Sequence, residues 1–474
     1  MTAAALFLAG PVISLPLLGA AVIAARPARV ATGWIAFGAS VGAFLLSCRL
    51  PGAALQDDVI LLDPLAAHMT MLTAFVGATT FWVCRDHTGD DVDRRGGGTR
   101  HALALICLGA TLAALMANNL GLVWACMEAA SGAAALLIGL PRTQPAARAA
   151  WRFLIVGGAA LALALFGTIL LTLAALPVLG PVPAAMSWTG LALAAPAAPA
   201  SLLSLAFVFL LVGYGTKAGL MPLHTWLPEA HAAGPTPMVA VLTGSVLNVA
   251  LAVLLRLRAV VAVNTDAIAP GPPLMLLGLL GLVLAGFTLW RRDDARHFFA
   301  VSAVGQSGVA AFAFGLGGAA AVFAGVLHVT VHTLARTAIS QCLGGAVFRG
   351  GGSRFADLAR PHLPLALTLG AGIVAVAGLP PFGLFSSEFL IANETVRRLP
   401  LLTLPLGLGL ALGGWALATR LVALLVAPNS ERGPAPNLAD LVPAWLHLAG
   451  VLLLGLAMPG AVVAWLTTIA AGAS

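Results

Sequence analysis

The sequence contains one lysine among its 24 Lys and Arg residues, and that residue, Lys217, stands in the apolar run from Leu202 to Met221. The guanidinium of arginine stays protonated, whereas a buried ammonium can release and regain a proton. The use of lysine at this one position therefore indicates proton handling. The alternative is a lysine near a helix end whose ammonium extends to water while its aliphatic stem covers apolar surface.

A carboxylate also stands inside an apolar run. Glu128 lies in the segment Leu122–Ala130, where an ionised side chain needs a partner. Lys217 is the natural candidate, because a change in the separation of the two groups would change the proton affinity of both. The alternative is a fixed ion pair that only orders the packing.

The segment that follows Lys217 carries two prolines, Pro222 and Pro228. Each proline removes a backbone donor, which a membrane helix tolerates only where protein or water satisfies the freed carbonyl groups. We therefore expect a hydrated helix break beside Lys217. His224 and His231 of this segment either relay protons or hold the break by hydrogen bonds, and Glu229 is a further supporting residue between them.

His328, His332 and Arg336 are spaced by four residues and therefore share one face of a predicted helix. Histidines exchange protons near neutral pH, so three stacked ionisable groups predict a polar axis. A single histidine would more often be a satisfied core residue. Three further polar residues of the apolar runs either hold ordered water or join neighbouring helices: Asn248, Ser302 and Gln306.

The composition of the chain indicates the environment in which these ionisable residues lie. The chain has 474 residues, of which 60% are hydrophobic and 9% charged, too few charges to cover a water-soluble domain. The apolar residues form blocks of about twenty, the length of a helix that crosses a bilayer, whereas strands of a barrel would alternate. We predict an all-α polytopic membrane protein of about fourteen helices. The predicted spans are residues 3–25, 31–48, 65–84, 101–118, 119–140, 151–176, 200–222, 237–263, 273–290, 298–318, 319–348, 364–395, 401–427 and 441–470.

An internal repeat predicts how the spans are organised. The segment Ala218–Pro222 recurs 159 residues later as Ala377–Pro381, and the same register places Glu229 opposite Glu388. The offset equals five helices, and an odd number of spans inverts the second copy in the membrane. We predict inverted five-helix repeats over residues 101–263 and 273–427, between three N-terminal helices (1–100) and a C-terminal helix (441–474). Pro380 and Pro381 then form a second break, and Glu388 can accept protons bound for the exit side.

Arginine placement predicts the orientation. When alternate loops are assigned to opposite faces, one face receives only Arg49, Arg256, Arg258, Arg397 and Arg398, and the other receives nearly all remaining arginines. The positive-inside rule makes the arginine-rich face cytoplasmic and the N-terminus extracytoplasmic. The clusters are short and separated by apolar blocks, which argues against a nucleic-acid partner. The five cysteines lack the spacing of a zinc or iron–sulfur site, so we expect no cofactor and no metal.

These motifs resemble a known family. Gly215–Leu220, followed by His224–His231, is similar to the antiporter-like proton-translocating subunits of respiratory complex I, multi-subunit sodium/proton antiporters and group 4 hydrogenases. Gly378–Phe389 most resembles the F-type branch of the hydrogenase-4 subunits, as does Asn118–Leu120 leading to Glu128. The resemblance implies fourteen core helices, of which the seventh and twelfth are broken. It also implies a proton route through Glu128, Lys217, the helix of His328, His332 and Arg336, and then Glu388.

Three positions bear on this resemblance. Complex I members often have a lysine where this chain has Asn248, which favours the hydrogenase branch. The family usually has a lysine at Arg336, and since arginine cannot deprotonate, the central relay here would depend on water and His332. The hydrogenase branch tends to have a glutamate where Gly305 stands, which argues against that branch.

The resemblance implies a proton-translocating subunit of a redox-driven complex in a bacterial-type inner membrane, of the hydrogenase-4 or NADH dehydrogenase type. Its partners would be other membrane subunits, the lipid bilayer and protons or sodium ions, and electrons would be handled by the partner subunits. The alternative is a cation/proton antiporter or an inorganic-carbon-uptake membrane subunit. A third hypothesis is a subunit that only braces its complex, which the arginine at position 336 favours.

Overall fold

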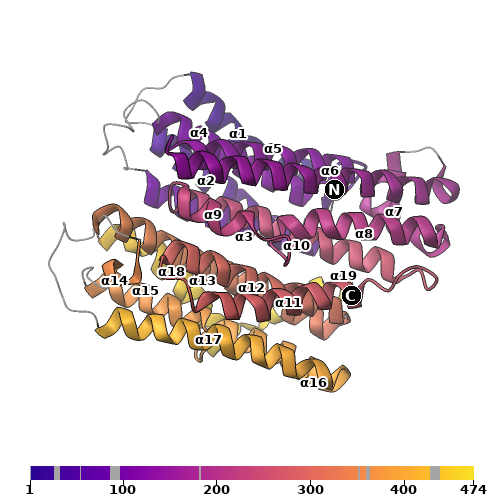
Figure 1. Cartoon of the computed structure of the whole chain (residues 1–474). Coiled ribbons are helices and arrows are strands. Elements are labelled where there is room, and N and C mark those ends of the chain that lie inside the picture. Colours follow the sequence, from indigo (N-terminus) through magenta and orange to yellow (C-terminus); the bar gives the residue numbers. More distant parts are fainter. Residues whose placement is uncertain are drawn as a thin grey trace. The chain divides into compact units, whose positions relative to one another are not determined.

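The apolar blocks form α-helices in a computed structural model of the chain (Figure 1), which describes residues 2–25, 32–53, 55–85, 97–180, 183–350, 353–358, 363–426 and 438–473. Within these ranges, 11 helices are long and apolar enough to cross a membrane, and four more apolar helices are shorter. The prediction of an all-α polytopic membrane protein is therefore confirmed. The segments 26–31, 86–96 and 427–437, which carry several of the arginines used for the orientation, lie outside these ranges.

The helices of the first part of the chain are α1 (Thr2–Ala25), α2 (Thr32–Ser47), α3 (Pro64–Cys84), α4 (Gly97–Met116), α5 (Leu120–Gly139), α6 (Gln144–Leu179), α7 (Trp188–Ala194), α8 (Ala200–Lys217), α9 (Trp226–Ala233) and α10 (Met238–Ala262). Two short strands, β1 (Leu55–Gln56) and β2 (Leu61–Leu62), pair antiparallel between α2 and α3. The helices that follow are α11 (Gly271–Leu289), α12 (Ala295–Leu316), α13 (Ala319–Gly350), α14 (Phe355–Leu358), α15 (Leu363–Val376), α16 (Gly383–Arg398), α17 (Thr403–Val426), α18 (Leu438–Leu456) and α19 (Gly460–Ala473).

The chain divides into two compact units. The first comprises residues 1–218 and 242–272, and the second comprises residues 219–241 and 273–472. Within each unit the long helices run along roughly one direction (Figure 1), and α6 packs extensively against α8 in the first unit. The division into residues 1–100, 101–263, 273–427 and 441–474 stays a prediction.

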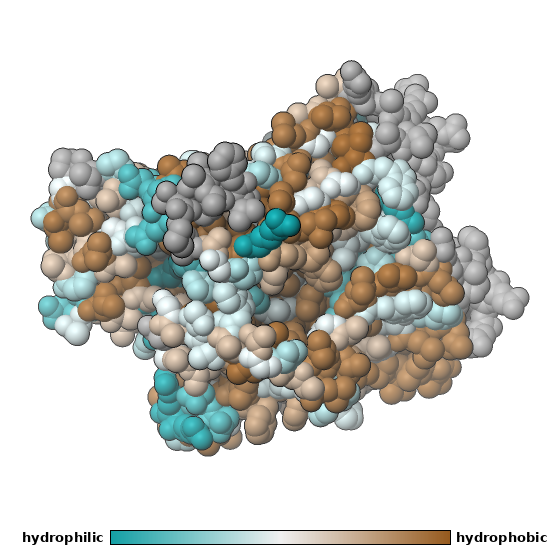
Figure 2. Space-filling model, turned by 180° about the vertical axis from the view of Figure 1, so that it is seen from behind, coloured by the Kyte–Doolittle hydropathy of each residue, from teal (hydrophilic) through white to brown (hydrophobic). Residues whose placement is uncertain are grey.

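Large apolar side chains cover the outer faces of many helices. Trp151, Ile155, Leu193 and Leu401 are all at least 64% exposed. Figure 2 shows hydrophobic residues over much of the face in view. A water-soluble chain would not leave so much contiguous apolar surface uncovered, whereas lipid or neighbouring membrane subunits cover it without cost.

Both predicted helix breaks are present and share their local backbone geometry. α8 ends at Lys217 and α15 ends at Val376, and each is followed by a glycine with positive φ, 74° at Gly219 and 66° at Gly378. Only glycine adopts this conformation without steric cost, so the sequence repeat has a backbone counterpart. The next prolines follow cis peptide bonds, Met221–Pro222 and Pro380–Pro381. The inversion of the second repeat stays a prediction.

Three details differ from the sequence expectations. Pro228 lies in the first turn of α9 rather than in the break, because the backbone N–H groups of a first turn have no acceptor within the helix. The stretch 177–199, which lies between two predicted spans, contains α7, whose N-terminus is capped by Ser187, and the 3₁₀ helices Pro183–Met186 and Ala195–Ala197. The predicted span 441–470 is two helices, α18 and α19, separated at Pro459, which cannot continue the hydrogen-bonded ladder of α18.

An ion pair in the first unit provides a test of stability. The guanidinium of Arg256 donates two hydrogen bonds of 2.7 Å to the carboxylate of Asp63, which also accepts from the backbone N–H of Ala66 and so caps α3. We expect Arg256→Ala to lower the free energy of unfolding by about 2 kcal/mol. Asp63→Ala should cost about 1 kcal/mol more, because it also removes the helix cap.

The measurement is thermal unfolding of the detergent-solubilised protein, with the double variant closing the thermodynamic cycle. Equal destabilisation by the two single variants would show that Asp63 contributes nothing as a cap.

Candidate proton-transfer sites

Lys217 is the last residue of α8 and is only 1% exposed. Its ammonium donates a 2.8 Å hydrogen bond to Ser131 Oγ and lies 4.9 Å from the centre of the Phe153 ring. Ser131 is the twelfth residue of the 20-residue helix α5, which places the ammonium beside the middle of an apolar span. The ammonium therefore lies in the interior of the first unit and does not extend to water.

Glu128 lies on α5, three residues before Ser131, and is half-buried. Its charge acts electrostatically on the Lys217 ammonium. In the part of the chain that the structure describes, however, no carboxylate lies within 4.0 Å of that ammonium, so the expected partnership does not take the form of a direct ion pair. Ser131, rather than Glu128, contacts the ammonium. The Glu128 carboxylate lies about one turn away on the same face of α5.

A glycine of α6 also lies close to the Lys217 ammonium. A Cβ built on Gly157 would lie 2.5 Å from the Lys217 Nζ, whereas a Cβ on the adjacent Gly158 meets no heavy atom within 4 Å. We expect Gly157→Ala to displace the ammonium from Ser131 and to lower proton translocation by roughly tenfold to a hundredfold, because proton transfer depends on position to within about 1 Å.

Gly158→Ala is the matched control, since both variants change the helix propensity of α6 equally. The readout is the rate of acidification inside vesicles that carry the assembled complex. Equal rates for the two variants would show that the position of the ammonium does not limit transport.

The residues His328, His332 and Arg336 all lie on a buried face of α13. They are 0%, 7% and 6% exposed, and the two imidazole rings stack with their centres 6.1 Å apart. A buried stack of two imidazoles that continues to a guanidinium is a polar stripe through an apolar helix bundle. The geometry fits the polar axis predicted from the sequence, whereas its role in transport stays a prediction.

His328 makes hydrogen bonds at both ring nitrogens. Nε2 lies 3.2 Å from the carbonyl oxygen of Gln306, which can only accept, and Nδ1 lies 3.0 Å from Ser387 Oγ. The Ser387 hydroxyl also lies 2.9 Å from the carbonyl oxygen of Leu384. The hydroxyl can therefore donate to a neutral His328, or donate to Leu384 while it accepts from a protonated His328. Both protonation states are satisfied without movement of the backbone.

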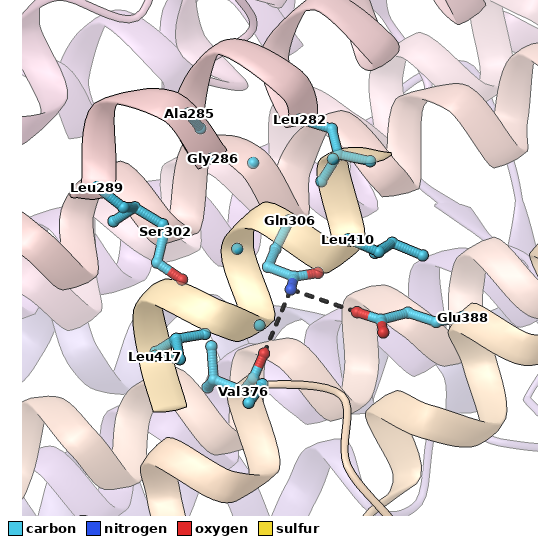
Figure 3. Close-up of a pocket in the computed structure, with 15 residues that line it drawn as sticks. Leu282, Ala285, Gly286, Leu289, Ser302, Gln306, Val376, Glu388, Leu410 and Leu417 are labelled. Atoms are coloured by element: carbon cyan, nitrogen blue, oxygen red, sulfur yellow. Dashed lines mark hydrogen bonds between the residues drawn. The ribbon is translucent and has the colours of Figure 1, made fainter. Parts of the chain in front are cut away.

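Glu388 lies on α16, after the second break, and is 9% exposed. The side-chain amide of Gln306 donates to Glu388 Oε1 at 3.3 Å and to the carbonyl oxygen of Val376 at 3.4 Å (Figure 3). A Cβ on Gly378 would lie 2.1 Å from Glu388 Oε2, so the glycine of the break also makes room for the carboxylate. Because the backbone of Gln306 contacts His328 and its side chain contacts Glu388, this one residue connects the histidine stripe to the carboxylate.

The ionisable residues of the break after α8 differ from one another in burial and in their neighbours. His231 is buried on α9 and lies within electrostatic range of Arg336, so it joins the stripe on α13. Glu229 and His224 are half-buried, and Glu229 acts electrostatically on His297 at the start of α12.

Of the predicted supporting residues, Ser302 is buried one turn before Gln306 on α12. Asn248 is buried on α10 and belongs to the first unit, whereas Gln306 belongs to the second.

Sequence reasoning missed Ser131, Ser387, Phe153 and Gly157. Serine and glycine are common in apolar helices of membrane proteins, where they usually serve close packing, so their types alone gave no signal. The one usable signal was spacing, because Ser131 follows Glu128 by three residues and Ser387 directly precedes Glu388.

Known proteins are similar to this chain in sequence and in fold. A family model described as "NADH:quinone oxidoreductase/Mrp antiporter, TM" matches residues 117–412. A relative named "Hydrogenase-4 component F homolog", from Methylacidiphilum infernorum (isolate V4), is 36% identical over 471 residues, which cover 96% of this chain and 98% of the relative.

Two solved structures have the same fold. One is a subunit of the archaeal membrane-bound sulfane sulfur reductase, with a TM-score of 0.84, 19% identity and coverage of 98% of this chain and 96% of that chain. The other belongs to respiratory complex I from Thermus thermophilus, with a TM-score of 0.83, 20% identity and coverage of 98% of each chain. This chain thus belongs to the family of antiporter-like membrane subunits that NADH:quinone oxidoreductases and Mrp antiporters share.

Proposed function

We propose that this chain translocates protons across a membrane as one subunit of a redox-driven complex of the hydrogenase-4 or NADH dehydrogenase type. The observation that carries the proposal is the ammonium of Lys217, which is buried beside the middle of a membrane span and bonded to a neutral serine. A fixed structural cation would be expected to bond directly to a carboxylate, whereas an ammonium held by a hydroxyl can give up its proton without leaving a buried anion unpaired. The relatives' names, a hydrogenase component and a NADH:quinone oxidoreductase family, supply the class of complex.

The proposed route begins at Glu128 and Lys217 in the first unit. It continues along His332 and His328 and ends at Glu388, with Gln306 between the last two. Arg336 remains protonated throughout, so it supplies a fixed positive charge that repels a proton on His332, and the proton moves by way of water and the imidazoles. The partner subunits carry the electrons.

The same proposal includes a bacterial-type inner membrane and an extracytoplasmic N-terminus. It rests on the distribution of arginines, because the loops on the two sides of the predicted spans differ strongly in their content of this residue. Partners would then be other membrane subunits packed against the exposed apolar helix faces.

Proteoliposomes that contain the purified complex test the function. We expect internal acidification only when an electron donor is supplied, and we expect the rate to be the same in sodium and in potassium buffers. Acidification driven by an imposed sodium gradient, without any donor, would instead show a cation/proton antiporter. Bicarbonate uptake without net proton movement would show a role in inorganic-carbon uptake.

A further inference from the structure

One arginine ties the end of α16 to the turn between α12 and α13 in the second unit. Arg398 is the last residue of α16, and its Nη1 donates hydrogen bonds to the carbonyl oxygens of Leu316, at 3.2 Å, and Gly317, at 2.7 Å. Leu316 is the last residue of α12, and α13 begins at Ala319. A single side chain therefore joins three helices.

The turn is shaped to accept the guanidinium. The last carbonyl groups of a helix have no donor within that helix, and their negative partial charge favours a cation. A Cβ built on Gly318 would lie 2.6 Å from Arg398 Nη2, so the glycine leaves room for the side chain. The end of α12 thus supplies both the acceptors and the space that the guanidinium needs.

On each of the three helices, ten residues separate this contact from the place where the histidine stripe meets the carboxylate. The pairs are Leu316 and Gln306 on α12, Gly318 and His328 at the start of α13, and Arg398 and Glu388 on α16. Ten residues of α-helix rise about 15 Å. The equal spacing brings Gln306, His328 and Glu388 to one level, where their hydrogen bonds form (Figure 3).

Apolar side chains fill the space between these two levels. Val309 and Phe312 of α12, Ala324 of α13 and Ile391 of α16 belong to one buried hydrophobic cluster. Apolar contacts are non-directional, whereas hydrogen bonds to a helix end are lost when one helix slides along another. The bonds of Arg398 therefore add a constraint on the position of α16 along its axis.

We propose that Arg398 is a positioning residue for proton transfer, which keeps α16 in register with α12 and α13 so that Gln306 stays bonded to Glu388. The guanidinium remains protonated throughout transport, so its link to the turn does not change. Glu388 changes its charge in the proposed route, and a neutral carboxyl group accepts the Gln306 hydrogen bond less strongly than a carboxylate does. The link at Arg398 then keeps the neutral group within reach of its donor. This inference rests on the proposed function.

The ion pairs at the end of α16 are separate from this link. Glu394 Oε2 lies 3.3 Å from Arg398 Nε, and both residues belong to α16. Glu394→Gln retains an oxygen that can accept this bond, so the contact between Arg398 and the turn should survive in that variant. Arg397 lies 3.9 Å from the same carboxylate and is 68% exposed, and in the part of the chain that the structure describes it makes no hydrogen bond to the turn.

The test compares Arg398→Met with Arg397→Met in proteoliposomes that contain the whole complex. Methionine keeps a long stem and has no strong hydrogen-bond donor. Both variants remove one charge from the end of α16, but only the first removes the link to the turn. We expect Arg398→Met to lower donor-driven acidification by roughly tenfold and Arg397→Met to leave it unchanged, because proton transfer depends on position to within about 1 Å.

A double variant separates a positioning role from a general loss of stability. Gln306→Leu removes the amide that donates to Glu388. If Arg398 acts through this amide, Arg398→Met should add no further loss to that of Gln306→Leu. Losses that multiply in the double variant would overturn the proposal. Should Arg398→Met fail to assemble, Arg398→Lys takes its place in the same comparison, since an ammonium can still bond to one carbonyl oxygen.

The outcomes distinguish this inference from the proposed function. Acidification that is equal in Arg398→Met and Arg397→Met, together with its loss in Lys217→Ala, would overturn the role of Arg398 and retain the function. Undiminished acidification in Lys217→Ala would contradict the proposed function and, with it, the positioning role.

Discussion

Replacement of Lys217 by alanine should lower donor-driven proton translocation by about a hundredfold or more, since a positioned proton-transfer group contributes roughly 10²–10⁴-fold. We propose the buried ammonium as the proton carrier of the first unit, and the chain has no other lysine that could take its place beside Ser131. Electron transfer by the partner subunits should continue in part. The number of protons translocated per electron should therefore fall, and a lower electron flow alone would not account for the loss. The measurement is acidification inside proteoliposomes beside the rate of donor oxidation.

Lys217→Arg distinguishes a proton carrier from a fixed charge. Arginine keeps the positive charge near Ser131 and Phe153 but does not deprotonate. We therefore expect the arginine variant to assemble and to translocate protons as poorly as the alanine variant. Full translocation by Lys217→Arg would show that only the charge is needed.

Replacement of Glu388 by glutamine should have the second large effect. Glutamine has almost the same shape and can still accept a hydrogen bond from Gln306, so the packing of α16 is retained. It cannot carry a proton, and we expect translocation to fall by about a hundredfold. Thermal unfolding in detergent should change little, because the buried carboxyl group is replaced by a neutral group of similar size.

Glu394→Gln is the matched control for Glu388→Gln. Glu394 lies on the same helix, but it pairs with Arg397 and Arg398 near the helix end, away from the histidine stripe. The loss of these pairs, whose arginines are largely exposed, should change stability by about 0.5 kcal/mol and leave translocation intact. Equal translocation by the two variants would remove Glu388 from the route.

Much of the site could be predicted from residue types because burial of a charge is rare. A lysine, two carboxylates and a histidine pair in apolar runs are expensive in a membrane, so each one indicates a site without knowledge of the fold. The structure places Lys217, His328, His332 and Glu388 in the interior, as this reasoning requires. The hydroxyl partners were missed, because only their spacing from Glu128 and Glu388 indicated them, and the contact between Lys217 and Ser131 depends on the packing of α8 against α5, which are far apart in the sequence.

About as much of the fold as of the site could be predicted from the sequence. Hydropathy identified nearly every span, because a run of about twenty apolar residues matches the thickness of a bilayer and is rare in water-soluble domains. The two breaks followed from repeated glycine and proline, whose backbone restrictions act locally. The division of residues 441–470 into α18 and α19 was missed, because the residues on both sides of Pro459 are equally apolar and composition alone cannot show where a helix stops.

The central claim is that ionisable groups of this chain carry protons rather than brace a complex. The most direct measurement is the number of protons translocated per electron by a complex whose antiporter-like subunit combines Glu128→Gln, Lys217→Met and Glu388→Gln. We predict that the triple variant assembles and that its number of protons per electron falls by the number that this subunit translocates. A ratio equal to that of the unaltered complex would contradict the account and leave the chain a structural subunit.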